Sequence, residues 1–305
     1  MKIVYFGSGE VSKGVLENLL KFVKPLAVIT KPDAPKGRGK RVLPTPVKEL
    51  AISKGIKVLT PKSLKDEGFL GELKALNPDF IMLADYGGIL PKEVLEIPRL
   101  YPLCFHPSLL PKYRGASPIE RAFFNCDDIL GLTVFVMNEK IDEGKIIIQD
   151  KIPLNPCENT KGEILPEITR MGAKMLYDSA KMILQGFRDF KPQIGEVSYA
   201  PRLKREEEFI NPYEGVKRTV GRINGLSPKP GARYVWRGKN LKLLKARPYL
   251  GEVINGNIGE FFYERKEKKL LLICSDGYVE IITVQVEGKN PISGYDFANG
   301  YLRQP

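Results

Sequence analysis

Three residues of this sequence have side chains suited to moving protons or attacking a carbonyl, and their positions could bring them together. His106 is the only histidine in the 305 residues, and it directly follows the apolar run LYPLCF. Cys104 stands two residues before it, and Asp142 lies in the glycine-containing turn KIDEGKIII. A histidine that transfers protons usually has an orienting partner, most often a carboxylate. We therefore predict a catalytic site in which Asp142 orients His106 and Cys104 lies beside them.

Each of the three residues also has an ordinary structural explanation. A single histidine is often structural or merely exposed, an Asp-Glu-Gly turn needs its aspartate for the turn itself, and a free cysteine is commonly buried as a small apolar group. Position favours the catalytic reading of His106. The loop after a parallel strand lies in the crevice where such sheets bind ligands.

The elements that would position these residues alternate between strand and helix. Apolar runs at 3–6, 25–30, 56–59, 79–85 and 100–105 predict strands, and helical spacing or length predicts helices at 11–20, 46–54, 63–76 and 91–96. Ser117 and Glu120, with Pro118 between them, predict a capping box that starts a helix, which leaves 106–116 as a loop. The alternation predicts an α/β fold with a doubly wound, mostly parallel sheet.

The second half of the chain has a different pattern. Strands are predicted at 132–137 and 145–154, followed by one long helix over 160–186. Prolines, glycines and dense charge in 192–209 then indicate a linker, and the short strands beyond it predict a small antiparallel β-barrel of the OB type. We predict a catalytic domain at 1–188, a linker at 189–206 and a β-barrel domain at 207–305.

Composition excludes several classes of protein. Four cysteines without a CxxC pair, together with one histidine, make a zinc site improbable, so we expect no metal. Gly7 and Gly9 do not continue into the GxGxxG spacing, which argues against a nicotinamide cofactor. No apolar run approaches the length of a bilayer span. We expect a cytoplasmic protein with reduced thiols and no membrane partner.

Positive charge is concentrated in two regions. The chain has 48 Lys and Arg against 36 Asp and Glu, a net charge of +12. Residues 201–250 contain 13 Lys and Arg against four acidic residues, and 31–50 contain six against two. Two basic regions favour a large polyanion such as RNA, although a mobile loop and solvent-facing strands would also explain them.

Several motifs resemble those of one family. HPSLLPKYRG, followed later by IDEG, resembles the signature of the 10-formyltetrahydrofolate-dependent formyltransferases, and KPDAPKGRGKRVLPTPVKELA resembles the basic loop of the members that act on methionyl-tRNA. DYGGILPKEVL, YAPRLKREE, PKPGA and VEGKNPISGYDFANGY extend the resemblance along essentially the whole chain. It implies transfer of a formyl group from N10 of the co-substrate 10-formyltetrahydrofolate to the α-amine of methionine on initiator tRNA.

The resemblance also implies site residues. The family's catalytic trio is Asn-x-His with a later Asp; His106 and Asp142 match it, whereas Cys104 stands where the family has asparagine. An amide donates well to a developing oxyanion and a thiol donates weakly. Three readings stay open: Cys104 is tolerated, which we favour, or is a nucleophile, or marks a slow or repurposed enzyme. The segments expected to hold the folate contain Ser108, Leu109, Leu110, Pro111, Tyr86, Gly87 and Ile89.

The basic regions are expected to contact tRNA, and Arg38 matches the arginine that the family presents to the acceptor end. A formyltransferase acting on an amino-sugar nucleotide is an alternative, as is a catalytically impaired tRNA- or folate-binding relative. We expect a monomer, although the sequence does not fix the oligomeric state, the acceptor-stem features or the order of the 31–43 loop. The residues expected to contact tRNA are Lys36, Arg38, Lys40, Arg41, Arg205, Lys217 and Arg218.

Overall fold

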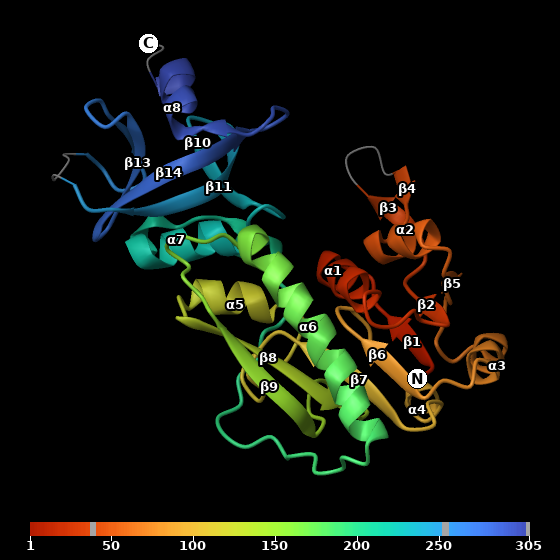
Figure 1. The fold of residues 1–305 in the computed structure, drawn as a ribbon. Coiled ribbons are helices and arrows are strands. Elements are labelled where there is room, and N and C mark those ends of the chain that lie inside the picture. Colours follow the sequence, from red (N-terminus) through yellow and green to blue (C-terminus); the bar gives the residue numbers. More distant parts are fainter. Residues whose placement is uncertain (37–40, 252–255, 303–305) are drawn as a thin grey trace. The chain divides into compact units, whose positions relative to one another are not determined.

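The chain folds into two compact units, each assembled from separate stretches of sequence. A computed structural model describes residues 1–36, 41–251 and 256–302. The first unit comprises Met1–Ala116, Gly131–Ile152 and Leu165–Pro201 (Figure 1). The second comprises Ser117–Leu130, Pro153–Ile164 and Arg202–Pro305. The helix that follows the His106 loop therefore belongs to the second unit by its contacts, although it lies within the predicted catalytic domain.

A seven-stranded, mostly parallel sheet forms the centre of the first unit. Its strand order is β5-β2-β1-β6-β7-β8-β9, in which β1 pairs in parallel with β2 and β6, β2 with β5, and β6 with β7, whereas β8 is antiparallel to β7. The chain builds outward from β1 in one direction and then in the other, as in doubly wound folds. The predicted fold class is confirmed. The strands are β1 (Ile3–Phe6), β2 (Ala27–Ile29), β5 (Lys57–Leu59), β6 (Phe80–Leu83), β7 (Tyr101–His106), β8 (Ile129–Val136) and β9 (Ile146–Pro153).

Helices cover both faces of this sheet. Side chains of α3 and α4 share a core cluster with Val4 and Phe6 of β1 on one face. On the other face, Gly14 of α1 lies against Thr169 of α6, and Gly172 of α6 lies against the Phe105 ring of β7. Successive side chains of a strand point to opposite faces of the sheet. Because helices cover both faces, both sets of side chains are buried, and the strands are almost continuously apolar. The helices are α1 (Glu10–Leu19), α2 (Pro46–Ser53), α3 (Glu67–Ala75), α4 (Lys92–Leu95) and α6 (Lys161–Leu184).

Gly7 and Gly9, which follow β1, let the backbone pass close to Ser12 and Asp85. A Cβ atom on Gly7 would lie 1.6 Å from the Ser12 hydroxyl, and one on Gly9 would lie 1.7 Å from an Asp85 carboxylate oxygen. The amides of Ser8 and Gly9 donate to the Asp85 carbonyl at 3.0 and 3.3 Å. The turn therefore brings the ends of β1 and β6 together, at the point where the strand order reverses.

The second unit contains a strongly curled antiparallel sheet. Its path is β10-β11-β14-β13-β12, with β15 added to β14. Rings from the two ends of the path meet in the core, since Tyr234 and Trp236 of β10 lie 5.5 and 6.0 Å from Phe261 of β12. This agrees with the predicted antiparallel C-terminal domain. The strands are β10 (Ala232–Trp236), β11 (Lys239–Tyr249), β12 (Phe261–Glu264), β13 (Lys269–Cys274), β14 (Gly277–Val286) and β15 (Ile292–Ser293).

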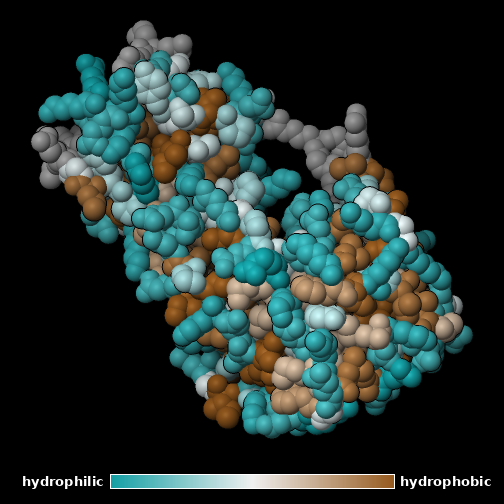
Figure 2. Space-filling view, in the orientation of Figure 1, coloured by the Kyte–Doolittle hydropathy of each residue, from teal (hydrophilic) through white to brown (hydrophobic). Residues whose placement is uncertain are grey.

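Helices complete the second unit, and two of them, α7 and α8, were not predicted. In α7, Val220 and Ile223 pack into the core of the curled sheet. On the face drawn in Figure 2, hydrophilic side chains cover much of this unit, with scattered hydrophobic ones between them. The helices are α5 (Pro118–Phe124), α7 (Val216–Gly225) and α8 (Gly294–Phe297), with short 3-10 turns at Arg205–Glu208 and Pro212–Glu214 and a π-helical turn at Ala298–Leu302.

The basic segment predicted as a loop contains a short hairpin. Strands β3 (Ala34–Lys36) and β4 (Arg41–Leu43) pair antiparallel, although prolines and glycines in this stretch had indicated an irregular loop. Two of the predicted tRNA contacts, Arg38 and Lys40, lie outside the described residues. Among the residues that the structure describes, no helix combines the length and the apolar character needed to cross a membrane.

Candidate active site

The site is built around the carboxyl end of β7. His106 is the last residue of this strand, which extends one residue beyond its predicted end at Phe105. It pairs with Thr133 of the antiparallel β8. Only 5% of its surface is exposed. Pairing with β8 at His106, and with β6 as far as Cys104, thus fixes the backbone from which the imidazole projects.

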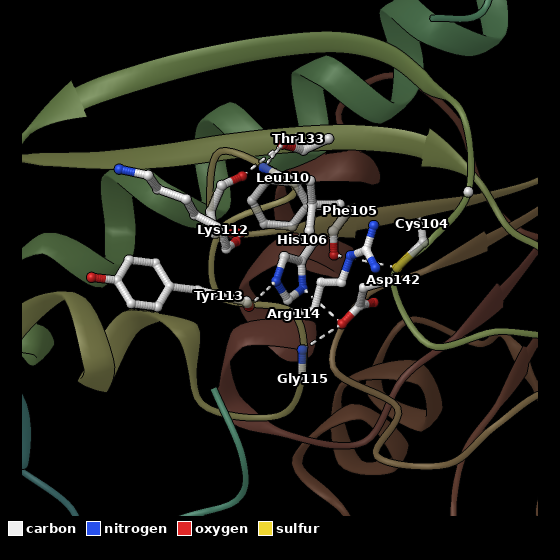
Figure 3. A network of polar contacts seen from close by, with 12 residues as sticks. Cys104, Phe105, His106, Leu110, Lys112, Tyr113, Arg114, Gly115, Thr133 and Asp142 are labelled. Carbon is white, nitrogen blue, oxygen red and sulfur yellow. Dashed lines mark hydrogen bonds and ion pairs between the residues drawn. The ribbon is translucent and has the colours of Figure 1, made fainter. Parts of the chain in front are cut away.

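Both ring nitrogens of His106 face protein groups (Figure 3). Nε2 lies 2.8 Å from the backbone oxygen of Tyr113, and Nδ1 lies 3.7 Å from Oδ2 of Asp142. Because a carbonyl oxygen only accepts hydrogen bonds, Nε2 must carry the hydrogen that it donates to Tyr113. The lone pair of a neutral ring is then on Nδ1, on the side of the carboxylate. A proton taken up at Nδ1 would lie beside a negative charge.

Asp142 is held in place by the loop that follows His106. Its Oδ2 accepts the Gly115 amide at 2.7 Å, and its backbone has a φ of 54° in the left-handed region. A non-glycine residue keeps such a conformation only where its surroundings require it. Gly115 is required for close approach, since at its φ of 121° a Cβ atom would lie 2.6 Å from the Ala200 carbonyl oxygen. The structure therefore brings together the predicted pair, His106 and Asp142.

Cys104 is a buried thiol beside this pair. Its Sγ donates weakly to the Phe105 carbonyl at 3.6 Å, and the side chain packs with Leu110 and Phe135. Burial raises the pKa of the Cys104 thiol well above its ordinary value, and the negative charge of Asp142 raises it further. The thiolate form, which a nucleophile requires, is therefore disfavoured.

Residues 108–111, called the SLLP loop, are hydrogen-bonded to β8 and β9. Thr133 Oγ1 donates to the Ser108 carbonyl at 2.6 Å and accepts the Leu110 amide at 3.3 Å. Gln149 donates to the Leu110 carbonyl and to Thr133, both at 3.0 Å. A Cβ atom on Gly131 would lie 2.1 Å from the Leu109 nitrogen, so loop and strand are in direct contact. Side-chain bonds to its backbone, as well as the flanking prolines, make the loop stiff.

The residues expected to hold the folate divide into two groups. Leu109, Gly87 and Ile89 are exposed and available to a ligand, with Leu109 and Ile89 37% and 62% exposed. The other side chains are committed to the protein interior, where Tyr86 packs edge-on against Phe6 at 5.5 Å. Burial also raises the pKa of Tyr86. The four buried residues are Tyr86, Ser108, Leu110 and Pro111.

Several residues that shape the site were not predicted as site residues, although Tyr113 and Gly115 lie within the motif HPSLLPKYRG. Tyr113 and Gly115 act through backbone atoms, and Gln149 reaches the SLLP loop from a strand that is distant in the chain. The predicted capping box at Ser117 is wrong. The Ser117 side chain makes no capping hydrogen bond, and Glu120 instead forms an ion pair with Lys161 at 2.8 Å. The helix nevertheless begins at Pro118.

The basic residues of the second unit also fall into two groups. Arg205, Lys217 and Arg218, which were expected to contact tRNA, are exposed, and no ion pair joins them to a carboxylate of the described residues. Other Lys and Arg side chains of the unit form ion pairs with its own carboxylates. Part of the positive charge counted in 201–250 is therefore used within the fold. The described ion pairs are Arg222–Glu214 at 3.2 Å, Arg233–Glu208 at 2.6 Å, Lys245–Glu163 at 2.5 Å and Arg247–Glu280 at 2.9 Å.

All four cysteines are free thiols. In the described part of the chain, no group of three or more His, Cys, Asp and Glu side chains is arranged to hold a metal ion.

Comparison with known proteins gives matches along both units. Residues 1–179 match the family model described as formyl transferase, and residues 202–302 match the model of the formyl transferase C-terminal domain. A methionyl-tRNA formyltransferase of Dictyoglomus turgidum is 38% identical over 99% of this chain and 96% of its own length. The enzyme of the same name from Thermodesulfovibrio yellowstonii is 34% identical over 98% of this chain and 95% of its own.

Solved structures share the fold at lower identity. HypX from Aquifex aeolicus matches with a TM-score of 0.67 and 18% identity, over 99% of this chain and 48% of that one. An N-formyltransferase from Helicobacter canadensis, in complex with folinic acid and dTDP-3-aminofucose, matches with a TM-score of 0.66 and 20% identity over 92% of this chain and 98% of that one. At these identities the likeness supports the fold alone.

Proposed function

The chain belongs to the formyl transferase family, and we propose that it transfers the formyl group of 10-formyltetrahydrofolate to the α-amine of methionine on initiator tRNA. The full-length similarity to proteins named methionyl-tRNA formyltransferase carries this proposal, at 38% identity over 99% of the chain. Buried His106 and partly buried Asp142 together supply the proton transfer that the reaction needs.

His106 acts in this proposal as the proton acceptor. Its Nε2–H is donated to the Tyr113 carbonyl, so the basic lone pair is on Nδ1, 3.7 Å from the Asp142 carboxylate. As the amine attacks the formyl carbon, a C–N bond forms, the carbonyl electron pair moves onto oxygen, and the nitrogen gives a proton to Nδ1. The imidazolium is stabilised by Asp142 on one side and by the Tyr113 carbonyl on the other.

The second half of the reaction returns that proton. When the tetrahedral species collapses, the bond between the formyl carbon and N10 breaks, and the departing nitrogen takes up the proton that His106 held. A role for His106 in polarising the formyl oxygen would require Nε2–H to leave the Tyr113 carbonyl. The geometry therefore favours proton transfer.

We propose that the exposed apolar side chains Leu109 and Ile89 contact the folate, together with the exposed backbone at Gly87. The bonds from Thr133 and Gln149 to the SLLP backbone would keep that surface fixed while the acceptor arrives. Ser108, Leu110, Pro111 and Tyr86 would support it from the interior.

The second unit would hold the tRNA. Exposed Arg205, Lys217 and Arg218 are suited to phosphate contacts, and we propose the same role for Lys36, Arg38, Lys40 and Arg41. This assigns catalysis to residues 1–188 and tRNA binding chiefly to 207–305. A tRNA acceptor and free thiols support a cytoplasmic enzyme, which we propose acts as a monomer.

The test is direct. The full chain is incubated with 10-formyltetrahydrofolate and initiator Met-tRNA, the tRNA is deacylated, and formylmethionine is measured. We expect product that depends on both substrates. Formylmethionine no greater than in a reaction without the folate would reject the proposal.

A further inference from the structure

One side chain in the stretch predicted as a linker is bonded to the turn that carries Asp142. Nε2 of Gln193 donates to the Asp142 carbonyl at 2.7 Å and to the Gly144 carbonyl at 3.0 Å. Gln193 precedes the 3-10 turn of the second unit and belongs to the first unit by its contacts. The turn therefore has a partner distant in the chain that holds its backbone, in addition to the Gly115 amide that holds its carboxylate.

The side-chain oxygen of Gln193 is also hydrogen-bonded. Its Oε1 accepts from Nε and Nη2 of Arg114 at 3.1 and 2.7 Å, and Nη1 of Arg114 lies 3.2 Å from Glu143. Carbonyls only accept and guanidinium groups only donate, so the amide has one possible orientation. Both donors and the acceptor oxygen of Gln193 are used, which is the arrangement expected of a group that fixes geometry.

The same stretch is attached to the His106 loop by its backbone. The Arg114 amide donates to the Ser198 carbonyl at 2.9 Å, the Ala200 amide donates to the Arg114 carbonyl at 2.7 Å, and the Tyr113 amide donates to the Ser198 hydroxyl at 2.9 Å. Tyr113 is the residue whose carbonyl accepts from His106. Residues 193–200 thus support both partners of the imidazole, the Tyr113 carbonyl on one side and the Asp142 turn on the other.

From these contacts we infer that Gln193 is a positioning residue for formyl transfer, which holds the left-handed Asp142 turn so that the carboxylate stays beside Nδ1 of His106. The inference rests on the proposed function. Gln193 touches neither imidazole nor carboxylate, and it acts through the two turn carbonyls. Loss of these bonds frees a turn whose conformation at Asp142, with φ at 54°, is otherwise unfavourable. We expect its displacement to cost about 10- to 100-fold in rate, the range known for residues that orient metal-bound histidines.

Two substitutions separate this role from simple support of the loop. Gln193→Met has nearly the same size and loses every bond. Gln193→Glu keeps an acceptor for Arg114 but presents oxygen to the carbonyls of Asp142 and Gly144, which it repels. If anchoring Arg114 were the whole role, Gln193→Glu would behave as wild type. Positioning predicts that both variants lose activity.

We expect kcat to fall about 10- to 100-fold in both variants, with KM for the folate and for tRNA unchanged. The matched control is Gln285→Met in β14, which removes a side-chain amide that donates to the Lys289 carbonyl at 2.8 Å. It should leave kcat unchanged. Wild-type kcat in Gln193→Glu, or an equal loss in Gln285→Met, would overturn the inference.

A second measurement does not depend on activity. His106 is the only histidine, so its ring signals in a carbon–proton NMR spectrum need no assignment. Removing the carboxylate with Asp142→Asn should move these signals, and Gln193→Met should move them in the same direction while thermal unfolding stays cooperative. Unmoved signals in a folded Gln193→Met protein would contradict positioning. If the wild-type protein makes no formylmethionine, the proposed function fails, whereas the NMR result still decides the role of Gln193.

Discussion

The His106 site and the basic surface of the second unit both depend on charged and polar side chains, but they are built differently. At the site, the imidazole and the carboxylate are each hydrogen-bonded to the loop backbone, and they lie 3.7 Å from each other. On the surface, Arg205, Lys217 and Arg218 are exposed to solvent. A buried network depends on each member, whereas exposed charges contribute separately and are screened by salt. Single substitutions should therefore be severe at the site and mild on the surface.

Replacing His106 should have the largest effect. We expect His106→Ala to lower kcat about 10²- to 10⁴-fold, because it removes the group that accepts the amine proton. Single-turnover formylation of Met-tRNA measures this loss. Folate binding, followed by fluorescence, should stay near the wild-type value, which would show that the fold is retained. A loss of less than about tenfold would remove His106 from the mechanism.

Replacing Asp142 should have an intermediate effect. In Asp142→Asn the side-chain oxygen can still accept the Gly115 amide, so the turn is kept while the negative charge beside Nδ1 is lost. We expect kcat to fall about 10- to 100-fold, measured in the same assay. Asp150→Asn, at an exposed carboxylate of β9, is the matched control and should behave as wild type. An active Asp142→Asn enzyme would mean that the carboxylate only shapes the turn.

The sequence was sufficient to predict the catalytic pair, His106 and Asp142, but not the residues that hold this pair in place. Strand and helix periodicity, together with the position of His106 at a strand end, was sufficient for the doubly wound sheet and for the approximate location of the site. The pairing with Asp142 followed from chemistry and resemblance. The roles of Gln193 and Tyr113 could not be found in this way, because Gln193 donates to a backbone carbonyl and Tyr113 accepts at its own, and both bonds form only in the folded chain.

The second unit shows the same limit. Charge counting identified the basic stretch, but it could not tell which cations meet carboxylates. Arg233 and Arg247 pair with Glu208 and Glu280, partners 25 and 33 residues away in the chain. The hairpin of β3 and β4 was also missed, since its prolines and glycines indicate a loop and only the pairing in space makes it a sheet.

Replacing exposed cations should have a smaller and salt-dependent effect. For Lys217→Ala and Arg218→Ala we expect weaker tRNA binding and a slope of log affinity against log salt that decreases by about one for each charge removed. Titrations at several salt concentrations measure it. Lys245→Ala is the control, because Lys245 is paired with Glu163 at 2.5 Å, and its slope should match wild type. Equal slopes in all variants would show that tRNA does not use this surface.

Replacing Cys104 should have the smallest effect. Its thiol stays protonated at neutral pH because burial and Asp142 raise its pKa. We therefore expect no formyl group on Cys104 by mass spectrometry during turnover. Cys104→Asn should equal or exceed the wild-type kcat, since asparagine adds a good donor. A formylated cysteine, or a severe loss in Cys104→Asn, would support covalent catalysis instead.

Acceptor choice tests the central claim most directly. The full chain is given 10-formyltetrahydrofolate with either initiator Met-tRNA or a dTDP-linked amino sugar, and release of tetrahydrofolate is followed in both reactions, with His106→Ala alongside. The account predicts release with Met-tRNA that His106→Ala abolishes, and only background release with the amino sugar. Release with the amino sugar that equals or exceeds release with Met-tRNA would contradict it.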